Sequence, residues 1–505
     1  MISKGHFLLL CRKCDKLLLS KNTSIYRISI PWLNLIRPHA IFLRNYSEIF
    51  DFSNSIFSFY FSPKKVIFAI LKFTFTFFRS LFNTKRFNRA KYRKLYDVII
   101  VSHLVSSTQL KVKNDLYFGS IPSELKNAGF KVLVVMIDQR ANKDCIESDR
   151  HLRQNGKDFI ILGWRSSLRY LLRSYILFFK EFLGLTYYAF FAKNNTEKKI
   201  LFSSAIDCLI NGPGTLLIAD QVAYLVANFK TKFLITTFEG HTYEKLIFAR
   251  SRKANSNLCC MGYQHATLFY LQHGIRRQLG KEYQPDIVLA SGVLSKRVFD
   301  TLNPNYQTLL LGSSRAGNLS RDIKRNSRFN SCLVLPEGTE SEVFKLFNYS
   351  LVCAKRFKNI KFIWRLHPAF SLDRLRALDM RFDQLPSNIK LSNTTLKEDA
   401  LVSDIALYRG SSSIIEAVTS GIVPVYLGVK NEISINPLYQ NSAAYLSVSD
   451  ISDFKAVLDL TYQKDESKIR LIKKRAVDHC LQIFSPLQVK PLLDFMKSNH
   501  ANSIY

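Results

Sequence analysis

The chain lacks the short motifs that mark several common enzyme classes. Its 505 residues contain no Walker phosphate loop, no Gly-x-Ser-x-Gly elbow and no His-Glu-x-x-His pair. These absences argue against a P-loop ATPase, an α/β-hydrolase and a zinc protease, because each class uses its motif to place reacting groups. Asp-x-Asp is also missing, and with it the carboxylate pair by which many group-transfer enzymes hold Mg²⁺ or Mn²⁺. We therefore expect a protein that works without a metal or another cofactor.

The sequence also has few features of an exported protein. Nine cysteines are scattered along it without a disulfide pattern, and Cys11-Arg-Lys-Cys14 has no second pair to complete a zinc site. No clean secretory signal opens the chain, because charged residues follow the short apolar run Phe7–Leu10 at once. These observations predict a reducing, cytoplasmic location.

Acidic residues are scarce relative to basic ones. There are 39 Asp and Glu against 72 Lys and Arg, which gives a formal net charge of +33. Such a chain attracts anions: phosphorylated substrates, acidic lipids or nucleic acid. Neither zinc-finger spacing nor an aromatic RNA-binding signature is present, so we expect no nucleic-acid partner.

The basic excess is greatest in residues 1–95, which carry 18 Lys and Arg against 3 Asp and Glu. The longest apolar run, 66–82, is interrupted by Lys72 and Arg79 and falls short of the about 20 residues that span a bilayer. Further basic residues follow it: Lys85, Arg86, Arg89, Lys91, Arg93 and Lys94. This pattern predicts a helix that lies in an anionic membrane surface, peripheral to the inner membrane. The alternative is a helix packed on the protein, with a solvated basic tail.

The rest of the chain alternates strands and helices. Buried-strand patterns occur at 97–103, 131–138, 215–219, 233–238, 258–263, 286–290, 332–336 and 361–366, and helices are expected at 118–130, 161–192, 340–357 and 467–498. Such alternation predicts doubly wound parallel sheets. We divide the chain into a partly irregular N-terminal region (1–95), a Rossmann-like domain (96–318), a polar linker (319–330) and a second Rossmann-like domain (331–505).

The most informative stretch, 404–428, reads as strand, polar loop, short helix and second strand. Its loop contains Arg409, Gly410, Ser411, Ser412 and Ser413. Backbone N–H groups and hydroxyls at a helix start can cradle a phosphate, and Gly410 allows close approach. We expect Arg409 to add positive charge at the mouth of this loop. One turn further on, Glu416 is placed to reach a ribose.

Other polar clusters also follow predicted strands, where ligands bind in open α/β sheets. Arg365 and His367 end the strand 361–366 and are suited to phosphate. In the first domain, Glu239, His241 and Glu244 follow one strand, and His265 and His273 follow the next. Glu337-Gly338 follows the first strand of the second domain. Each cluster also has an ordinary structural interpretation, such as helix capping, a satisfied strand-end histidine or a turn.

Together these motifs resemble those of bacterial surface-carbohydrate biosynthesis proteins, of capsule or lipopolysaccharide, with the GT-B glycosyltransferase fold. The resemblance covers about residues 97–495. The motifs that carry it are Phe238-Glu-Gly-His-Thr-Tyr-Glu244, Gly262-Tyr-Gln-His265, Gln284-Pro-Asp-Ile-Val-Leu-Ala-Ser-Gly292, Leu335-Pro-Glu-Gly338, Trp364-Arg-Leu-His-Pro368 and Arg409-Gly-Ser-Ser-Ser413. The His-Pro and Ser-Ser pair is also similar to that of polysialyltransferases and CDP-glycerol polymer transferases. The resemblance implies two Rossmann-like domains that face a cleft, the first for the acceptor and the second for the donor.

In those families the His-Pro and Ser-Ser pair binds the phosphates of a cytidine nucleotide, and by resemblance His367 and Ser411 to Ser413 take this role. The acidic general-base motif of those families is not clearly reproduced. Our first choice for the base is Glu239, with His241 and Glu337 as alternatives. The function that follows is sugar transfer from a nucleotide-sugar, CMP-linked among the options, to a surface polysaccharide or lipid-linked glycan. A glycerophosphotransferase, a sugar-nucleotide epimerase and a non-catalytic scaffold of glycan assembly remain alternatives.

Overall fold

The protein is described here from a computed structural model. The structure describes residues 3–20, 23–33, 35–43, 63–83, 85–88, 92, 95–112, 114–140, 158–277, 279–302, 306–318, 329–368, 370–462 and 466–501. Most of the predicted linker, 319–328, lies outside these residues, as do Arg89, Lys91, Arg93 and Lys94 of the basic tail.

The first domain is built on a seven-stranded parallel sheet with the order β3-β2-β1-β4-β5-β6-β7. Its strands are β1 (Val98–Leu104), β2 (Val132–Asp138), β3 (Phe159–Ile161), β4 (Phe233–Thr237), β5 (Cys259–Gln264), β6 (Ile287–Ala290) and β7 (Gln307–Leu310). The helices beside it include α6 (Ile121–Asn127), α10 (Gly212–Phe229), α11 (Thr242–Ala254) and α12 (Val293–Leu302). β1, β4 and β6 are buried along their whole length, and β5 is buried from its second residue on, as expected for a parallel sheet covered on both faces.

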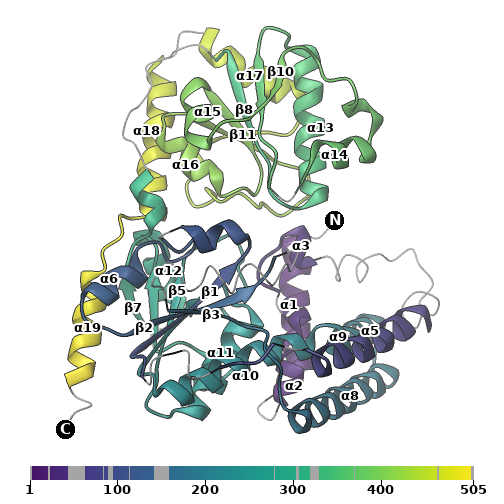
Figure 1. Ribbon diagram of the computed structural model, residues 1–505. Coiled ribbons are helices and arrows are strands. Elements are labelled where there is room, and N and C mark those ends of the chain that lie inside the picture. The colour runs from purple at the N-terminus through teal and green to yellow at the C-terminus, as the bar shows by residue number, and fades with distance from the viewer. Residues whose placement is uncertain are drawn as a thin grey trace.

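The second domain carries a six-stranded parallel sheet with the order β10-β9-β8-β11-β12-β13. Its strands are β8 (Ser331–Leu335), β9 (Lys361–Trp364), β10 (Ile389–Leu391), β11 (Ile405–Tyr408), β12 (Val423–Leu427) and β13 (Leu446–Val448). The helices are α13 (Glu340–Arg356), α14 (Leu372–Leu378), α15 (Leu396–Val402), α16 (Ser413–Thr419) and α17 (Ile451–Tyr462). The two domains lie one above the other (Figure 1), and the prediction of two doubly wound α/β domains is confirmed.

One predicted strand is wrong. Residues 215–219 lie inside α10 (Gly212–Phe229), a helix of 18 residues. A short apolar run is consistent with either a buried strand or a buried helix, and length decides between them. Here the apolar pattern continues to Phe229, and α10 packs along α11.

The C-terminal helices join the domains. α18 (Glu466–Ile483) packs on the second domain, whereas α19 (Lys490–Ala501) returns to the first domain and buries Leu492 and Met496 in its core. Between them, the Ser485 N–H donates to the Ser291 carbonyl at 2.9 Å. The last helix therefore belongs structurally to the first domain, although the sequence division placed it in the second.

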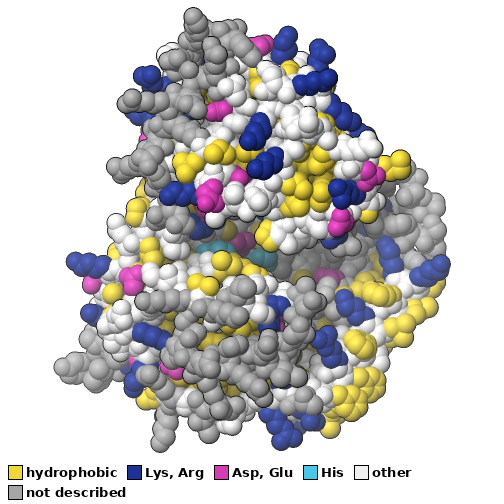
Figure 2. All heavy atoms as spheres, turned by 45° about the horizontal axis from the view of Figure 1, so that its top comes forward, with side chains coloured by type: hydrophobic (Ala, Val, Ile, Leu, Met, Phe, Trp, Pro, Cys, Tyr) yellow, Lys and Arg dark blue, Asp and Glu magenta, His cyan; other side chains and the backbone are white. Residues whose placement is uncertain are grey.

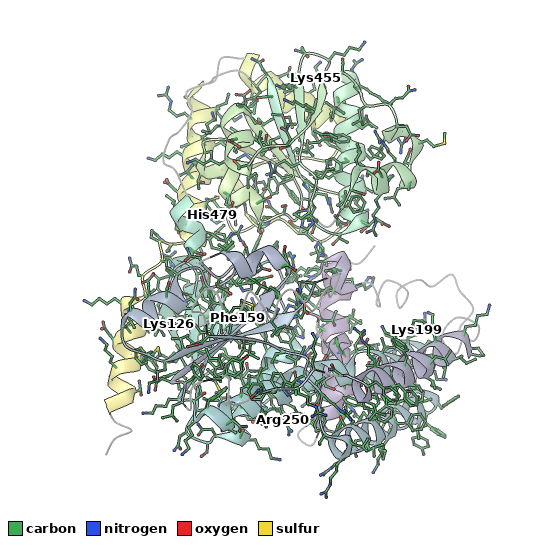
Figure 3. The ribbon with its side chains drawn as sticks, viewed as in Figure 1. Lys126, Phe159, Lys199, Arg250, Lys455 and His479 are labelled. Atoms are coloured by element: carbon green, nitrogen blue, oxygen red, sulfur yellow. The ribbon has the colours of Figure 1, made fainter. Side chains whose placement is uncertain are left out.

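The described part of the N-terminal region contains several helices that pack together. The helices α1 (Lys4–Leu18), α2 (Ile25–Ile28), α3 (Ala40–Leu43) and α5 (Pro63–Leu81) pack with α8 (Leu168–Phe190) and α9 (Asn195–Ile210). Their shared core buries Phe7, Cys11 and Cys14, so both thiols of the first cysteine pair act as small apolar groups. In Figure 1 α5, α8 and α9 project from the side of the first domain, and Figure 3 marks Lys199 on α9.

Candidate active site

The groove between the two domains collects the polar side chains that follow the strands. Figure 2 shows histidine and acidic side chains at the bottom of this groove. Polar side chains follow β1, β4 and β5 in the first domain and β8, β9 and β11 in the second. Parallel sheets bring such strand ends to one edge, which is where open α/β domains bind ligands.

On the first domain, Glu239 lies between two imidazoles. The Nε2 atoms of His265 and His241 lie 3.4 Å and 3.8 Å from its carboxylate oxygens. Burial alone would raise the pKa of Glu239, but the hydrogen bond with His241 and the charges of His265, His241 and Arg37 lower it to about 2. Glu239 is therefore a carboxylate throughout the neutral pH range.

The neighbouring carboxylate, Glu244, has a structural role. It is fully buried and accepts hydrogen bonds from the backbone N–H groups of Glu239, Gly240 and His241 at 3.0, 2.8 and 2.8 Å. Burial raises its pKa to about 7, although His241 and the backbone donors oppose the rise. This capping arrangement at the start of α11 fixes the loop that presents Glu239.

His103, at the end of β1, adds a third imidazole to those of His241 and His265. Its Nε2 atom lies 3.2 Å from both the Thr237 and the Tyr243 hydroxyl oxygens, and burial lowers its pKa to about 4. Burial also lowers the pKa of His265, whose ring meets Tyr117 edge-on at 4.9 Å. We did not select His103 from the sequence, although its place after a buried strand is the same signal that identified His265.

On the second domain, three strand-end loops meet closely. A Cβ atom added to Gly410 would lie 2.7 Å from the Glu337 carboxylate, and one added to Gly338 would lie 2.8 Å from the His367 ring. The two glycines therefore permit Glu337 and His367 to lie against the backbone of neighbouring loops. The Ser411 and Ser413 hydroxyl oxygens are 2.6 Å apart beside them. The structure thus brings together His367, Glu337, Gly410 and the serine loop.

Arg409 differs from its predicted place at the mouth of the loop. Its guanidinium is buried and donates to Glu342 at 2.6 Å, to Glu432 at 2.9 Å and to the Leu427 carbonyl at 2.9 Å. With its hydrogen bonds directed into the domain, Arg409 holds β11, β12 and α13 together instead of facing the groove.

Arg365 and Glu416 are also engaged within the protein. Arg365 bonds to Asp399, to the Ser392 hydroxyl at 3.0 Å and to the Thr394 carbonyl at 2.8 Å. The Glu416 carboxylate accepts two hydrogen bonds from Arg315, both at 3.1 Å. Arg315 precedes β8, so this pair ties α16 to the connection between the domains. Both side chains, predicted from the sequence to contact the nucleotide, thus have hydrogen-bond partners within the protein.

His273 anchors the N-terminal region instead of lining the groove. Its Nε2 atom lies 2.8 Å from the Asp15 carboxylate, and its backbone N–H donates to the Ile36 carbonyl at 2.5 Å. The segment held there carries His39, whose Nε2 atom bonds to Glu337 across the groove. His39 was missed because a single histidine in an irregular stretch gives no sequence signal.

Two properties of the described residues bear on cofactors and membranes. Within them, no group of three or more His, Cys, Asp and Glu side chains is arranged to hold a metal ion. Nor does any single helix in the described ranges have the length and apolarity to cross a bilayer, although α9 and α10, bent by 55°, pass that test as a pair.

Comparisons with known proteins gave likeness in structure only. No protein-family model matches the sequence, and no curated protein matches it. The fold is similar to a trehalose 6-phosphate synthase from Burkholderia multivorans, at 11% identity and a TM-score of 0.47, over 81% of this chain and 98% of that one. It is also similar to a glycosyltransferase from Rickettsia africae, at 13% identity and a TM-score of 0.45, over 81% of this chain and 100% of that one.

Proposed function

We propose that the protein is a metal-independent glycosyltransferase that moves a sugar from a nucleotide-sugar, with a CMP-linked donor among the options, to a surface polysaccharide or lipid-linked glycan. One observation carries this proposal: a carboxylate flanked by imidazoles on one domain faces a glycine- and serine-lined loop cluster on the other. Sugar transfer needs these two parts, a proton acceptor for the incoming hydroxyl and a binding site for the leaving phosphate.

The second domain holds the donor in this proposal. His367 and the hydroxyls of Ser411, Ser412 and Ser413 donate hydrogen bonds to phosphate oxygens. Gly410 allows that phosphate to approach the backbone. As the bond between the anomeric carbon and the phosphate oxygen breaks, the electron pair stays with the phosphate, and these donors stabilise the added charge.

The first domain activates the acceptor. Glu239 accepts the proton of the acceptor hydroxyl while the hydroxyl oxygen bonds to the anomeric carbon. Because its pKa of about 2 makes Glu239 a weak base, the proton moves only as the new bond acidifies the hydroxyl. His241 and His265 keep the carboxylate oriented.

Product analysis tests the reaction class. With isotopically labelled nucleotide donors, transfer of the sugar without its phosphate supports the proposal. Transfer of a phosphate-linked group would instead indicate a glycerophosphotransferase, and a change of sugar configuration without transfer would indicate an epimerase. Either of these results contradicts sugar transfer.

We further propose that the protein binds the anionic surface of the inner membrane, where lipid-linked acceptors are found, through α5 and α8. The two helices pack together through Phe73 and Tyr175, whose rings are 4.7 Å apart. Each also exposes an apolar stripe with helical spacing, formed by Phe68, Leu71, Phe75, Phe78 and Phe82 in and just after α5, and by Leu168, Leu172, Ile176, Phe179, Leu183, Tyr187 and Phe190 on α8. Two adjacent stripes of exposed apolar side chains are typical of an interaction site.

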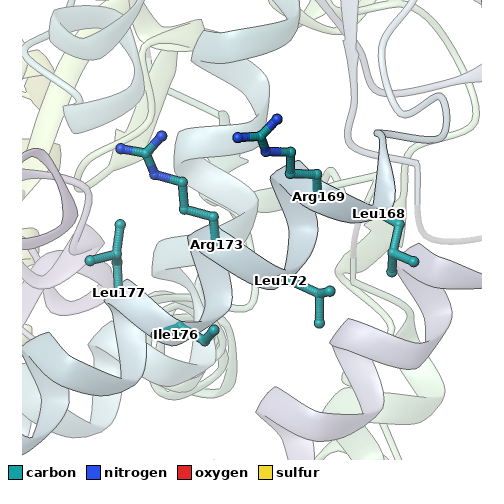
Figure 4. A pocket seen from close by; sticks show the side chains of 6 residues that line it. All are labelled: Leu168, Arg169, Leu172, Arg173, Ile176 and Leu177. Carbon is teal, nitrogen blue, oxygen red and sulfur yellow. The ribbon is translucent and has the colours of Figure 1, made fainter.

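Basic residues accompany these stripes. Figure 4 shows Arg169 and Arg173 projecting from α8 on the side away from Leu172 and Ile176. Figure 2 shows apolar side chains gathered over the projecting helices, with Lys and Arg side chains beside them. An apolar face with a basic face opposite it is the pattern of a helix that lies in an anionic lipid surface.

Vesicle sedimentation tests the membrane proposal. Ile176→Glu together with Leu183→Glu should lower partitioning onto phosphatidylglycerol vesicles at least tenfold, because two charges would enter the apolar layer. Met380→Glu, at an exposed apolar position on the second domain, is the control and should bind like the wild type. Equal binding by all three proteins contradicts the proposal. A change in oligomeric mass without loss of vesicle binding would also contradict it, by making the stripes an interface between copies.

A further inference from the structure

The N-terminal segment 35–43 forms part of the wall of the groove. Leu35 and Ile36 are buried, and the Ile36 carbonyl accepts hydrogen bonds from the backbone N–H groups of His273 and Gly274 at 2.5 Å and 3.1 Å. Phe42, at the end of the segment, lies with its ring centroid 6.2 Å from that of His241. The segment is therefore fixed against the loop of Glu239, although it is some 200 residues away in the sequence.

His39 fixes the other side of this segment. Its Nδ1 atom accepts a hydrogen bond from the Ile41 N–H at 3.2 Å, so its Nε2 atom carries the proton that it donates to Glu337. The His39 side chain is almost completely buried. The same short segment thus contacts both domains at the groove.

Arg37 lies between these two anchors with an incomplete set of partners. The carbon of its guanidinium lies 3.3 Å from the ring centroid of Phe269, which fixes the plane of the group. The charges of Glu337 and Glu239 act on it from the two sides of the groove. Its Nη1 atom is buried and has no hydrogen-bond partner.

We propose that Arg37 is a substrate-binding residue that donates hydrogen bonds to the phosphate of the nucleotide donor, from the side opposite the serine loop. This inference rests on the proposed function and extends it. A buried donor without a partner is destabilising and therefore calls for an explanation. A phosphate oxygen supplies the missing partner, and charge-assisted bonds of this kind are among the strong ones.

The arrangement also suits a site that binds an anion between two carboxylates. Glu239 and Glu337 alone would repel a phosphate, and Arg37 offsets their charge at the point where their fields overlap. The stacked, planar guanidinium is preorganised, so little side-chain entropy is lost when it binds. Arg37 lies in the N-terminal segment, outside the predicted donor domain. Its contact with the phosphate would therefore also couple donor binding to the position of that segment.

Binding of a nucleotide and of its nucleoside tests this role. Wild type, Arg37→Ala and Arg37→Lys are titrated with CMP, CDP and UDP by calorimetry and with cytidine and uridine by ligand-observed NMR. We expect Arg37→Ala to weaken nucleotide binding at least tenfold and leave nucleoside binding within twofold. Arg37→Lys should lie between, because it keeps the charge and loses the planar fork. Arg12→Ala, on the exposed face of α1, is the control and should match wild type.

The outcomes separate this inference from the proposed function. If wild type binds none of the three nucleotides, the proposed function fails. If wild type binds a nucleotide and Arg37→Ala binds it equally well, the inference fails alone. A parallel loss of nucleotide and nucleoside binding in both Arg37 variants would also overturn it, because it would show damage to the groove and no specific contact with phosphate.

Discussion

At the scale of single residues, the site depends on how neighbouring charges set the protonation of Glu239. Burial opposes its ionisation, but two imidazoles and Arg37 outweigh burial. The pKa of Glu244, only five residues further on, is raised instead of lowered, because burial is the larger effect there. The two carboxylates therefore have different tasks: Glu239 faces the groove, and Glu244 holds the loop.

The first prediction concerns the role of Glu239 in turnover. Glu239→Gln should lower the rate of sugar transfer about 10²- to 10⁴-fold, the range expected for loss of a general base. Nucleotide affinity should not fall, because the serine loop and His367 on the other domain are unchanged and loss of a carboxylate near the phosphate does not weaken its binding. Turnover close to that of wild type would remove Glu239 as the base and move the assignment to His241 or Glu337.

The second prediction concerns stability and pH. A carboxyl whose pKa is lowered in the folded state stabilises the protein above its unfolded pKa, and this contribution is lost as the pH falls toward the folded value. For Glu239 the window runs from 4.5 down to about 2. The free energy of unfolding of wild type should exceed that of Glu239→Gln by at most about 3 kcal/mol at neutral pH. The difference should shrink below pH 4.5, and a difference that grows there would contradict the assigned charge.

At the scale of elements, the loops after the strands are held by close backbone contacts. Gly240 has φ of 93°, and a Cβ atom there would lie 2.2 Å from the Gly274 carbonyl carbon. Gly129, with φ of 96°, has no heavy atom within 4 Å of the same position. The two glycines have nearly the same φ and very different surroundings, which makes them a matched pair.

The third prediction uses this pair. Gly129→Ala should cost about 1 kcal/mol of unfolding free energy, the usual cost of a non-glycine residue in the left-handed region. Gly240→Ala should cost clearly more, because two backbone segments must also separate, and it should disturb the Glu239 loop. Urea unfolding measures the loss of unfolding free energy in both variants. Equal losses would show that the two backbone segments separate without a further energetic cost.

The fourth prediction concerns Arg409. Removing one member of a buried ion pair costs about 3–5 kcal/mol, so Arg409→Met should destabilise the second domain strongly. Arg374→Met, which breaks an exposed pair with Glu340 at 2.6 Å, is the control and should cost less than about 1 kcal/mol. If Arg409→Met is stable but binds nucleotide poorly, Arg409 belongs to the ligand site after all.

Most elements of the sheets could be predicted from the sequence, because buried parallel strands read as short apolar runs with polar residues after them. The position of Glu239, His265 and His367 at the groove followed from the same pattern. The partners of Arg409, Arg365 and Glu416 could not be predicted, since they come from segments distant in the chain. Glu342, Asp399 and Arg315 become neighbours only when the sheets are assembled.

At the scale of the whole molecule, both ends of the chain complete the first domain. The N-terminal segment supplies His39 and Arg37 to the groove, and α19 fills the opposite side of the core. Figure 3 marks His479 on α18 near the junction of the two domains, just before the chain crosses between them. The domain boundaries predicted from the sequence rest on composition, which does not report packing. Neither contribution to the first domain could therefore be predicted.

The fifth prediction tests the role of α19. Leu492→Ala should cost about 2–5 kcal/mol, the usual range for a fully buried leucine. Hydrogen exchange should show the loss of protection in the first domain, around β5 and β6, with the second domain unchanged. Leu471→Ala, an exposed position on α18, should change stability by less than about 0.5 kcal/mol. Loss of protection confined to the second domain would contradict the assignment of α19.

The most direct test of the central claim is the binding of CMP, CDP and UDP to the wild-type protein, followed by calorimetry. We predict that at least one of these nucleotides binds, and that His367→Ala and Ser412→Ala each weaken its binding. Unchanged affinity in both variants would place the nucleotide elsewhere. Failure of all three nucleotides to bind the wild type would contradict the claim that the groove is the donor site of a glycosyltransferase.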